Sequence, residues 1–368
     1  MTSPTCARIH VNRLRFNYRE ISKRIAPARL IPVVKADAYG HGAVPISRCL
    51  VDEGADLLAV AQYQEAMELR ENGIRIPILV FGRIMPDDLP DAIQAGFRIT
   101  LFGEEDIDWI ENTSGSQQAV VHVNFETGMG RVGVMPDRVP RFLERLTRSR
   151  HCVWEGMYSH FATADETDKT YAKKQLSHFT ALMSQLEARG LLPPVIHMAN
   201  SGAVLDMPQS YFNACRCGIM LYGHYPSKET SRSLPLKQVM NLQTVVTHTR
   251  RLPAGHNVSY GCRWTTDRET TIAVLPIGYA DGVRRHLTGR LQVSIAGRRY
   301  PVVGTITMDQ IMVDVGDDPV AVGQPVLIWG ESENDRIEVL DVAEAMGSIP
   351  YELTCGVSKR VPRVVVDD

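Results

Sequence analysis

A lysine stands directly after an apolar run near the start of the chain. Lys35 follows residues 30–34 in the segment VVKADAYGHG. An ammonium group beside a buried strand is costly unless it is paired or takes part in chemistry. A lysine that is shielded from water among other cations loses its proton readily, and its amine then attacks carbonyl groups. Lys35 is therefore a candidate nucleophile that could form a Schiff base with an aldehyde.

Further polar residues follow later apolar runs in the same way. A single histidine of this kind is more often a hydrogen-bonded core residue than a catalytic group. If the runs are parallel strands, however, the residues that follow them meet at one edge of the sheet. The residues in such positions are Arg131 in ETGMGRVG, His160 in YSHFA, His197, Asn200 and Ser201 in HMANSG, and Arg216 in RCGIMLYG.

The elements that must position these residues alternate between strand-like and helical patterns. Helical spacing in residues 62–72 and 170–189 separates short apolar runs. Eight such units in series predict a closed (β/α)8 barrel, and no G-x-G-x-x-G follows the first run to favour an open dinucleotide-binding sheet. The predicted strands are residues 30–34, 57–61, 76–81, 97–102, 119–124, 154–159, 195–198 and 212–216.

After about residue 233 the pattern becomes β-rich, with turn signals between short runs. We expect a barrel domain over residues 8–232 and a mainly β domain over residues 233–368, against which residues 1–7 pack. A single helix, residues 340–346, interrupts the second domain. Its predicted strands are residues 242–250, 270–275, 291–295, 300–303, 310–315 and 325–329.

The residues at the predicted barrel mouth suit pyridoxal phosphate, whose aldehyde would react with Lys35. Barrels often bind a phosphate group after strands seven and eight. Asn200-Ser201-Gly202, at the start of a predicted helix, would supply hydroxyl and backbone N–H donors there. Gly218 and Ile219, after the eighth strand, would supply further N–H groups.

Composition limits the other classes of function. The chain has 368 residues, 44% hydrophobic and 22% charged, with a net charge of -2, which gives no basic field for nucleic acid. No signal peptide or membrane-spanning run is recognisable, so we expect a soluble cytoplasmic protein. The seven cysteines form no C-x-x-C pair, and neither a metal site nor a disulfide is expected.

Taken together, the motifs resemble those of the alanine racemases, the fold type III family of pyridoxal-phosphate enzymes, over residues 7–363. The resemblance implies a barrel joined to a β domain. It also implies a head-to-tail homodimer in which each active site takes residues from the partner's β domain. The matching motifs are VVKADAYGHG, ETGMGRVG, SHFA, HMANSG, RCGIMLYG, VSYG, IGYADG, TMDQ and RVPR.

The resemblance implies two catalytic bases. Lys35 would hold the cofactor as a Schiff base and act as one base, and Tyr260 in VSYG would be the other, reaching in from the second subunit. Free tyrosine titrates at about pH 10, so Tyr260 needs nearby cations to ionise. Arg216 would face the pyridine nitrogen and keep it unprotonated, with His160 and His197 forming a network around Arg216 and Tyr260.

Binding roles are implied for other residues. Arg131 would contact the phenolic oxygen of the cofactor and the substrate carboxylate. The phosphate site would consist of Tyr39, Ser201, Gly218, Ile219 and Tyr351. The substrate site would include Met308 and Asp309, and the corridor leading to it would include Tyr279 and Arg285.

Two positions depart from the family pattern. Many members carry a carbamylated lysine seven residues before the arginine that matches Arg131, and this chain has Asn124. An amide cannot supply the negative charge, so we expect a bound anion such as chloride beside Arg131. Thr307 precedes Met308 where cysteine is common, next to the segment that would hold the substrate carboxylate.

Alternatives remain open from the sequence. A racemase for serine or for a broad range of amino acids would have the same motifs. Basic amino-acid decarboxylases share the barrel and the lysine, but they tend to place an acidic partner on the pyridine nitrogen, which Arg216 argues against. A non-catalytic carrier of the cofactor would lack the β domain. If alanine is the substrate, the expected use is D-alanine supply for peptidoglycan or D-alanine breakdown.

Overall fold

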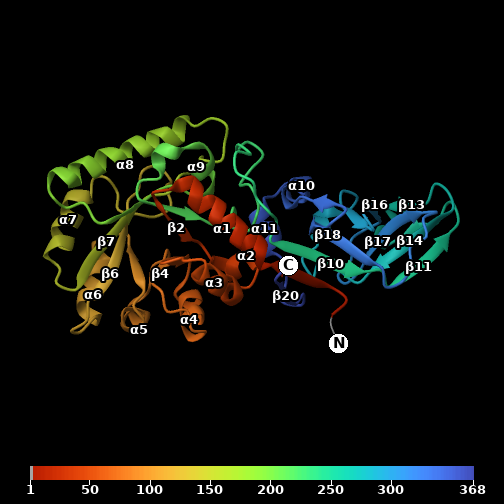
Figure 1. Ribbon diagram of the computed structural model, residues 1–368, viewed down its shortest axis with the longest axis horizontal. Coiled ribbons are helices and arrows are strands. Elements are labelled where there is room, and N and C mark those ends of the chain that lie inside the picture. Colours follow the sequence, from red (N-terminus) through yellow and green to blue (C-terminus); the bar gives the residue numbers. More distant parts are fainter. Residues whose placement is uncertain (1–2) are drawn as a thin grey trace.

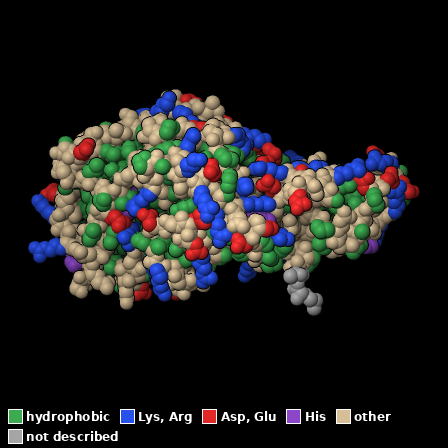
Figure 2. All heavy atoms as spheres, in the orientation of Figure 1, with side chains coloured by type: hydrophobic (Ala, Val, Ile, Leu, Met, Phe, Trp, Pro, Cys, Tyr) green, Lys and Arg blue, Asp and Glu red, His purple; other side chains and the backbone are tan. Residues whose placement is uncertain are grey.

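A computed structural model describes residues 3–368 of the chain. It has two parts, a barrel of strands and helices and an elongated, mainly β part, which lie end to end (Figure 1). The C-terminus lies near the junction between them. Charged side chains of both signs are interspersed over the face shown in Figure 2. Within the described residues, no helix has the length and apolar character needed to cross a membrane.

The first part confirms the predicted barrel. Its eight strands are all parallel, and each pairs with the next in the order β2-β9-β8-β7-β6-β5-β4-β3. A parallel bridge between Val33 and Ala59 brings the two ends of this sheet together. The strands are β2 (Arg29–Pro32), β3 (Leu58–Val60), β4 (Ile78–Val80), β5 (Arg98–Leu101), β6 (Ala119–Asn124), β7 (Cys152–Tyr158), β8 (Val195–His197) and β9 (Ala214–Cys217).

Amphipathic helices cover the outside of the barrel. In α7 the buried residues are Val139, Phe142, Leu143 and Leu146, a spacing that puts one apolar stripe against the strands. Apart from α2, described below, the helices of this part are α1 (Val11–Ile25), α3 (Ala43–Asp52), α4 (Tyr63–Glu71), α5 (Leu89–Gln94), α6 (Glu104–Thr113), α7 (Val139–Arg148), α8 (Thr170–Ala188) and α9 (Ser201–Asp206), with short 3-10 turns at Pro86–Asp88 and Pro208–Ser210.

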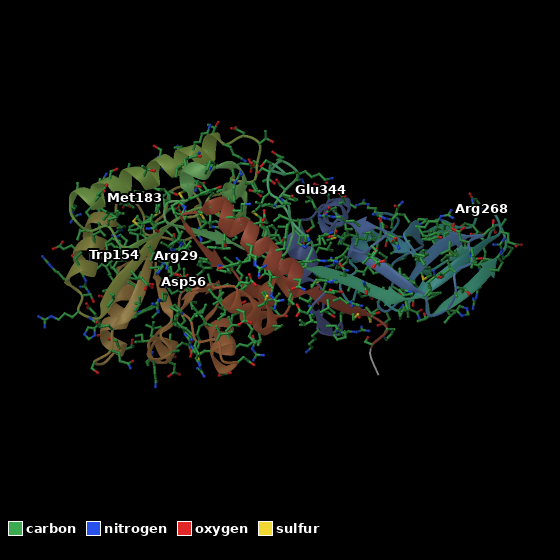
Figure 3. The ribbon with its side chains drawn as sticks, in the orientation of Figure 1. Arg29, Asp56, Trp154, Met183, Arg268 and Glu344 are labelled. Carbon is green, nitrogen blue, oxygen red and sulfur yellow. The ribbon has the colours of Figure 1, made fainter. Side chains whose placement is uncertain are left out.

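Ion pairs lie at the amino-terminal end of the barrel strands. Arg29, the first residue of β2, donates to Asp56 at 3.3 Å, and the two side chains lie together in Figure 3. Arg98, the first residue of β5, donates through Nε and Nη2 to both oxygens of Glu155 at 3.0 and 2.9 Å. The second pair is only partly exposed, and its carboxylate comes from the middle of β7.

The second part is built on a 10-stranded sheet, as the β-rich pattern predicted. Its main path is β11-β14-β17-β16-β15-β18-β10-β1-β20, and β12 pairs separately with β13. The strands are β1 (Cys6–His10), β10 (Met240–Val245), β11 (His248–Leu252), β12 (Asn257–Val258), β13 (Trp264–Thr265), β14 (Thr270–Leu275), β15 (Gln292–Ile295), β16 (Arg298–Val303), β17 (Ile311–Gly316), β18 (Pro325–Glu331), β19 (Arg336–Ile337) and β20 (Arg363–Val366).

Two sequence predictions for this part were wrong. Residues 242–250 are not one strand: β10 pairs with β18 whereas β11 pairs with β14, so the chain bends between them at Val246. The second part also has two helices rather than one. The predicted helix is α10 (Val339–Ala345), and α11 (Pro350–Cys355) follows it. With six residues, α11 is too short to give a clear apolar periodicity.

The chain enters the second part before it builds the barrel. Strand β1 pairs antiparallel with β10 and parallel with β20, so its residues up to His10 belong to the ten-stranded sheet. The predicted boundary at residue 233 falls in the connection between β9 and β10 and stays a prediction, as does the packing of residues 1–7, of which residues 1–2 lie outside the described chain.

The segment after β2 has an unusual backbone. In α2 (Lys35–Gly40), four successive residues from Ala36 to Tyr39 have φ between +52° and +54°, which makes a left-handed turn. Each non-glycine residue in that conformation costs about 1–2 kcal/mol. Hydrogen bonds offset part of the cost: Ala36 N donates to Glu65 Oε1 at 2.6 Å, and Asp37 Oδ1 accepts from Ala43 N at 2.7 Å. His41 Nδ1 also contacts the Ala38 and Tyr39 carbonyls of this turn, at 3.0 and 2.9 Å.

This geometry predicts that Ala36→Gly stabilises the protein. Glycine adopts positive φ without strain, so we expect the free energy of unfolding to rise by about 0.5–1 kcal/mol after the loss of chain entropy is counted. The matched control is Ala181, which is exposed in the middle of the right-handed helix α8. Ala181→Gly should lower the free energy of unfolding by about 1 kcal/mol. Urea unfolding measures both. A lower stability for Ala36→Gly would contradict the prediction.

Candidate active site

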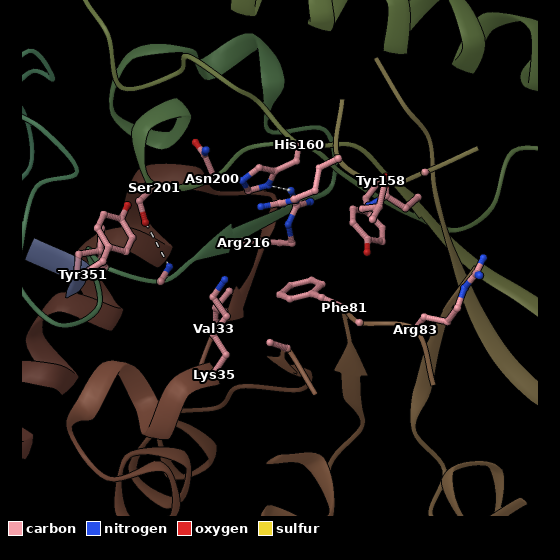
Figure 4. A pocket seen from close by; sticks show the side chains of 18 of the residues that line it. Val33, Lys35, Phe81, Arg83, Tyr158, His160, Asn200, Ser201, Arg216 and Tyr351 are labelled. Carbon is pink, nitrogen blue, oxygen red and sulfur yellow. Dashed lines mark hydrogen bonds between the residues drawn. The ribbon is translucent and has the colours of Figure 1, made fainter. Parts of the chain in front are cut away.

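A pocket of about 790 Å³ opens at the carboxyl ends of the barrel strands (Figure 4). Most of the residues that the sequence assigned to a cofactor site line it. Those from the barrel lie at the end of a strand or in the segment after it, whereas Tyr351 comes from α11 of the second part. The structure thus brings together Lys35, Tyr39, Arg131, His160, Asn200, Ser201, Arg216, Gly218, Ile219 and Tyr351.

Arg216 forms the centre of the pocket floor and is almost fully buried. Its Nη1 donates to His197 Nδ1 at 2.8 Å and to the His197 carbonyl at 2.9 Å. Its Nη2 donates to the Ser159 carbonyl at 2.7 Å and to His160 Nδ1 at 3.1 Å. Within residues 3–368 the Nε–H finds no acceptor, so it is free to donate to an acceptor in the cavity. Burial lowers the pKa of Arg216 to about 10.

His197 lies beneath the pocket rather than in its lining. It is fully buried, with its ring stacked on Tyr158 at 4.8 Å and an interplanar angle of 14°. Burial, and then the charge on Arg216, lower its pKa well below the usual value, and the pKa of His160 is lowered in the same way. Both histidines are therefore neutral and accept hydrogen bonds from Arg216.

The Lys35 side chain extends into the cavity from the end of β2 (Figure 4). Burial lowers the pKa of its ammonium group, and the positive charge of Arg131 lowers it further. The charge of Glu65 acts in the opposite direction. Because the neutral amine is the nucleophilic form, this environment favours the chemistry that the sequence suggested for Lys35.

One end of the pocket suits a phosphate group. A Cβ atom on Gly218 would overlap the Tyr39 hydroxyl, so only glycine leaves this close approach open. Ser201 Oγ accepts from Gly218 N at 3.2 Å, and Tyr351 packs beside Tyr39 with ring centroids 5.9 Å apart. Burial raises the pKa of both tyrosines, so their hydroxyls stay protonated and can donate. Asn200 caps α9 by accepting from Ala203 N at 3.0 Å.

Another group of predicted site residues lies outside this pocket. Tyr260 is 75% exposed and Met308 is 51% exposed, and both belong to the second part of the structure. Asp309 pairs with Arg360 at 2.8 Å, and Tyr279 N donates to the Thr307 carbonyl at 3.0 Å. Arg285 opens a 3-10 turn, Arg285–Leu287, and a similar turn spans Tyr260–Cys262. A single chain therefore does not unite Lys35 with Tyr260.

Sequence reasoning missed several residues of the pocket wall. Tyr158, the last residue of β7, lies with its ring 5.0 Å from Arg216 Cζ, a cation–π distance. Its place at the end of a predicted strand was the signal that could have found it. Arg83, just after the predicted strand 76–81, carries the same signal. The other wall residues carry no chemical signal in the sequence and are recognisable only in the fold: Val33, Ala61, Phe81, Gly82, Phe102, Val132 and Gly133.

Asn124, the first departure from the family pattern, also lines the pocket. A Cβ on Gly133 would crowd the Asn124 side-chain oxygen, which places the amide close to the loop that carries Arg131. No carboxylate in the described part of the chain pairs with Arg131. The bound anion expected beside Arg131 stays a prediction.

The fold and pocket define a class of protein: a barrel joined to a β domain, with a lysine of lowered pKa in a pocket at the carboxyl ends of the barrel strands. Residues 9–226 match the family model "Alanine racemase, N-terminal domain", and residues 239–365 match "Alanine racemase, C-terminal domain". The chain belongs to the alanine racemase family.

Similar proteins cover almost the whole chain. Alanine racemase from Desulforamulus reducens is 42% identical over 100% of both chains. A solved structure of alanine racemase from Clostridium difficile 630 superposes with a TM-score of 0.94 at 38% identity, covering 100% of this chain and 97% of that one. The Bacillus anthracis enzyme, solved with bound L-Ala-P, has a TM-score of 0.93 at 36% identity and covers 100% and 96%.

The charge of Arg131 predicts a measurable effect on Lys35. Arg131→Met should raise the pKa of Lys35, because it removes the nearby charge that lowers it most. The titration can be followed by NMR of 13C-methylated lysine in protein free of pyridoxal phosphate, with Lys35→Ala for assignment. Arg83→Met, which changes another arginine of the pocket wall, is the matched control and should leave the midpoint of the Lys35 titration unchanged. Equal midpoints for Arg131→Met and the parent would refute the prediction.

Proposed function

We propose that the protein interconverts L- and D-alanine with bound pyridoxal phosphate. The observation that carries this proposal is one pocket that holds a lysine of lowered pKa and a buried arginine whose Nε–H has no acceptor within residues 3–368. Membership of the alanine racemase family supports the same activity. The cytoplasm and the supply of D-alanine for peptidoglycan are the setting that we propose.

The residues of the pocket match the parts of this cofactor. Lys35 Nζ would hold it covalently, and Arg216 Nε would donate to its ring nitrogen. Its phosphate would bind to backbone N–H groups and hydroxyls at the end formed by Tyr39, Ser201, Gly218, Ile219 and Tyr351. When bound, pyridoxal phosphate withdraws electrons from the substrate Cα and acidifies its hydrogen.

Inversion at Cα needs one base on each face of the carbon. Lys35 would exchange a proton with one face through Nζ, which its surroundings keep easy to deprotonate. Tyr260 of a second copy would exchange a proton with the other face through its hydroxyl. His160, which accepts from Arg216 through Nδ1, would offer its Nε2–H to that hydroxyl and stabilise the phenolate. Arg131 would orient the substrate carboxylate from within the pocket.

A homodimer completes this arrangement. Tyr260, Tyr279 and Met308 are exposed on the second part of one chain, although their motifs match active-site residues of the family. A head-to-tail dimer would bring them to the pocket of the other copy. There Met308 and Asp309 would help to bind the substrate carboxylate, and Tyr279 and Arg285 would border the corridor.

Alanine is favoured over serine by the state of Thr307. Its Oγ1 donates to the Gln310 carbonyl at 2.8 Å and accepts from Gln310 N at 3.1 Å. Because its one O–H is already donated to this carbonyl, Thr307 has no free donor that would bind a serine hydroxyl. The family membership likewise gives no support to a decarboxylase.

The activity is tested by chiral chromatography after incubation of the loaded protein with single L-amino acids. We expect D-alanine to form well ahead of D-serine, D-lysine and D-arginine. Lys35→Ala should reduce the rate by roughly 10³-fold or more, because it removes both the cofactor anchor and one base. Comparable rates for serine would favour the broad-range alternative. No D-product from any substrate would contradict the proposed function.

Mixing two inactive variants tests the shared active site. Lys35→Ala and Tyr260→Phe should each lose most activity, but dissociating and reassociating an equal mixture should restore about one quarter of the parent value. This fraction follows because half of the random dimers pair the two variants and each such dimer has one complete site. A mixture of Lys35→Ala with Lys35→Ala,Tyr260→Phe is the control and should stay inactive. No recovery in the test mixture would exclude sites shared between subunits.

A further inference from the structure

A chain of hydrogen bonds runs from Arg216 through the interior of the barrel. Arg216 Nη1 lies 2.8 Å from His197 Nδ1, and His197 Nε2 lies 2.9 Å from His122 Nδ1. His122 Nε2 in turn lies 3.0 Å from Glu155 Oε2. Both histidines are fully buried, whereas Glu155 is partly exposed at the other end of the barrel, where Arg98 binds its carboxylate. The pocket floor is thus connected to the amino-terminal end of the strands.

The direction of every proton in this chain is fixed by its first member. A guanidinium group only donates, so His197 Nδ1 must accept from Arg216. His197 then carries its proton on Nε2 and donates to His122 Nδ1. His122 likewise carries its proton on Nε2 and donates to Glu155. Both histidines must therefore be neutral and in the same tautomer.

Two features of β7 place Glu155 in this chain. The pairing of β6 with β7 shifts register between Val121 and His122, so Trp154 and Gly156 have partners on β6 and Glu155 lies between them as an extra residue. Such a bulge redirects a side chain that regular alternation would point elsewhere. In addition, a Cβ on Gly156 would overlap the His122 ring. A bulge and a glycine are both needed for Glu155 to meet His122.

The hydrogen-bonded link to Glu155 matters because Arg216 carries a buried positive charge. Arg216 is buried, and all its protein acceptors within residues 3–368 are carbonyl oxygens or neutral imidazoles. An unpaired buried cation is costly, and a carboxylate linked to it by hydrogen bonds lowers that cost. Burial opposes ionisation of Glu155, yet the hydrogen bonds from His122 and Arg98 lower its pKa to about 2. Glu155 therefore supplies a negative charge at the end of the hydrogen-bond chain that lies farthest from Arg216.

We propose that Glu155 is the remote counter-ion of Arg216, acting through His122 and His197 as two neutral histidines of fixed tautomer. Glu155 and His122 are positioning residues in this scheme. The inference deepens the proposed function, because a charge held on Arg216 keeps any ring nitrogen that faces it unprotonated. Its geometry does not depend on that function.

Other ionisable groups face this chain from the surrounding elements and set the background against which Glu155 acts. They are Arg29 from β2, Arg98 from β5, Tyr158 from β7, Cys215 and Cys217 from β9, and Lys35, Arg131 and His160 from the segments at the pocket. The cations among these groups disfavour the protonated form of Arg216. The carboxylate of Glu155 offsets part of this repulsion.

The tautomers give a first test in the unmodified full chain. In 15N-histidine NMR, with His122→Phe and His197→Phe for assignment, both residues should show a protonated Nε2 and an unprotonated Nδ1 from pH 6 to 9. A proton on Nδ1 of either residue, whether in the other tautomer or in the doubly protonated form, would overturn the proposal. This measurement uses no activity assay, so it stands or falls separately from the racemase proposal.

The charge is tested with Glu155→Gln, which keeps an oxygen to accept from His122 but removes the carboxylate. With 13Cζ-labelled arginine and Arg216→Lys for assignment, the midpoint at which Arg216 loses its proton should fall by about one pH unit. Asp56→Asn is the matched control: it removes a carboxylate that pairs with Arg29 at the same end of the barrel, and should shift the midpoint far less. Equal midpoints in Glu155→Gln and the parent, or an equal shift in Asp56→Asn, would overturn the proposal.

Discussion

Burial of a guanidinium group at the base of the pocket is the constraint on which the rest of the site depends. Arg216 needs acceptors for its N–H groups, and β7, β8 and the segments after them supply carbonyls and imidazoles. Those acceptors must be neutral, which requires histidines that are shielded from water. The strands of the barrel provide that shielding. The same arrangement leaves one N–H for the cavity, so satisfying a structural need also defines what the pocket can bind.

The alternation of apolar and amphipathic segments was enough to predict the barrel, because its strands are short and most of their residues are buried. It could not predict the left-handed turn from Ala36 to Tyr39, since alanine and tyrosine ordinarily favour other conformations and contacts with Glu65 and Ala43 select this one. The prediction of one strand over residues 242–250 was wrong for a similar reason. Strand propensity there is continuous, and only the choice of partner strands divides the run.

For the site, the residues that follow strands were predictable because the topology brings strand ends together. Residues in the middle of strands were not. His122 and Glu155 look like ordinary members of β6 and β7, and the register shift that brings Glu155 to His122 exists only in the paired sheet. For Tyr260 and Met308 the sequence predicted the role but not the position in the fold. Their motifs were recognisable, but one chain leaves them exposed and away from the pocket lining.

The position of β1 affects the order in which the protein can fold during synthesis. Its two partners in the sheet, β10 and β20, are translated only after the whole barrel, and β20 is the last strand of the chain. A barrel built from neighbouring strands can close as soon as they leave the ribosome, whereas β1 must wait unpaired. The β-rich sheet is therefore completed only after β20 has been synthesised. Until then, an exposed strand edge accompanies a folded barrel, and the nascent chain depends on that edge staying unoccupied.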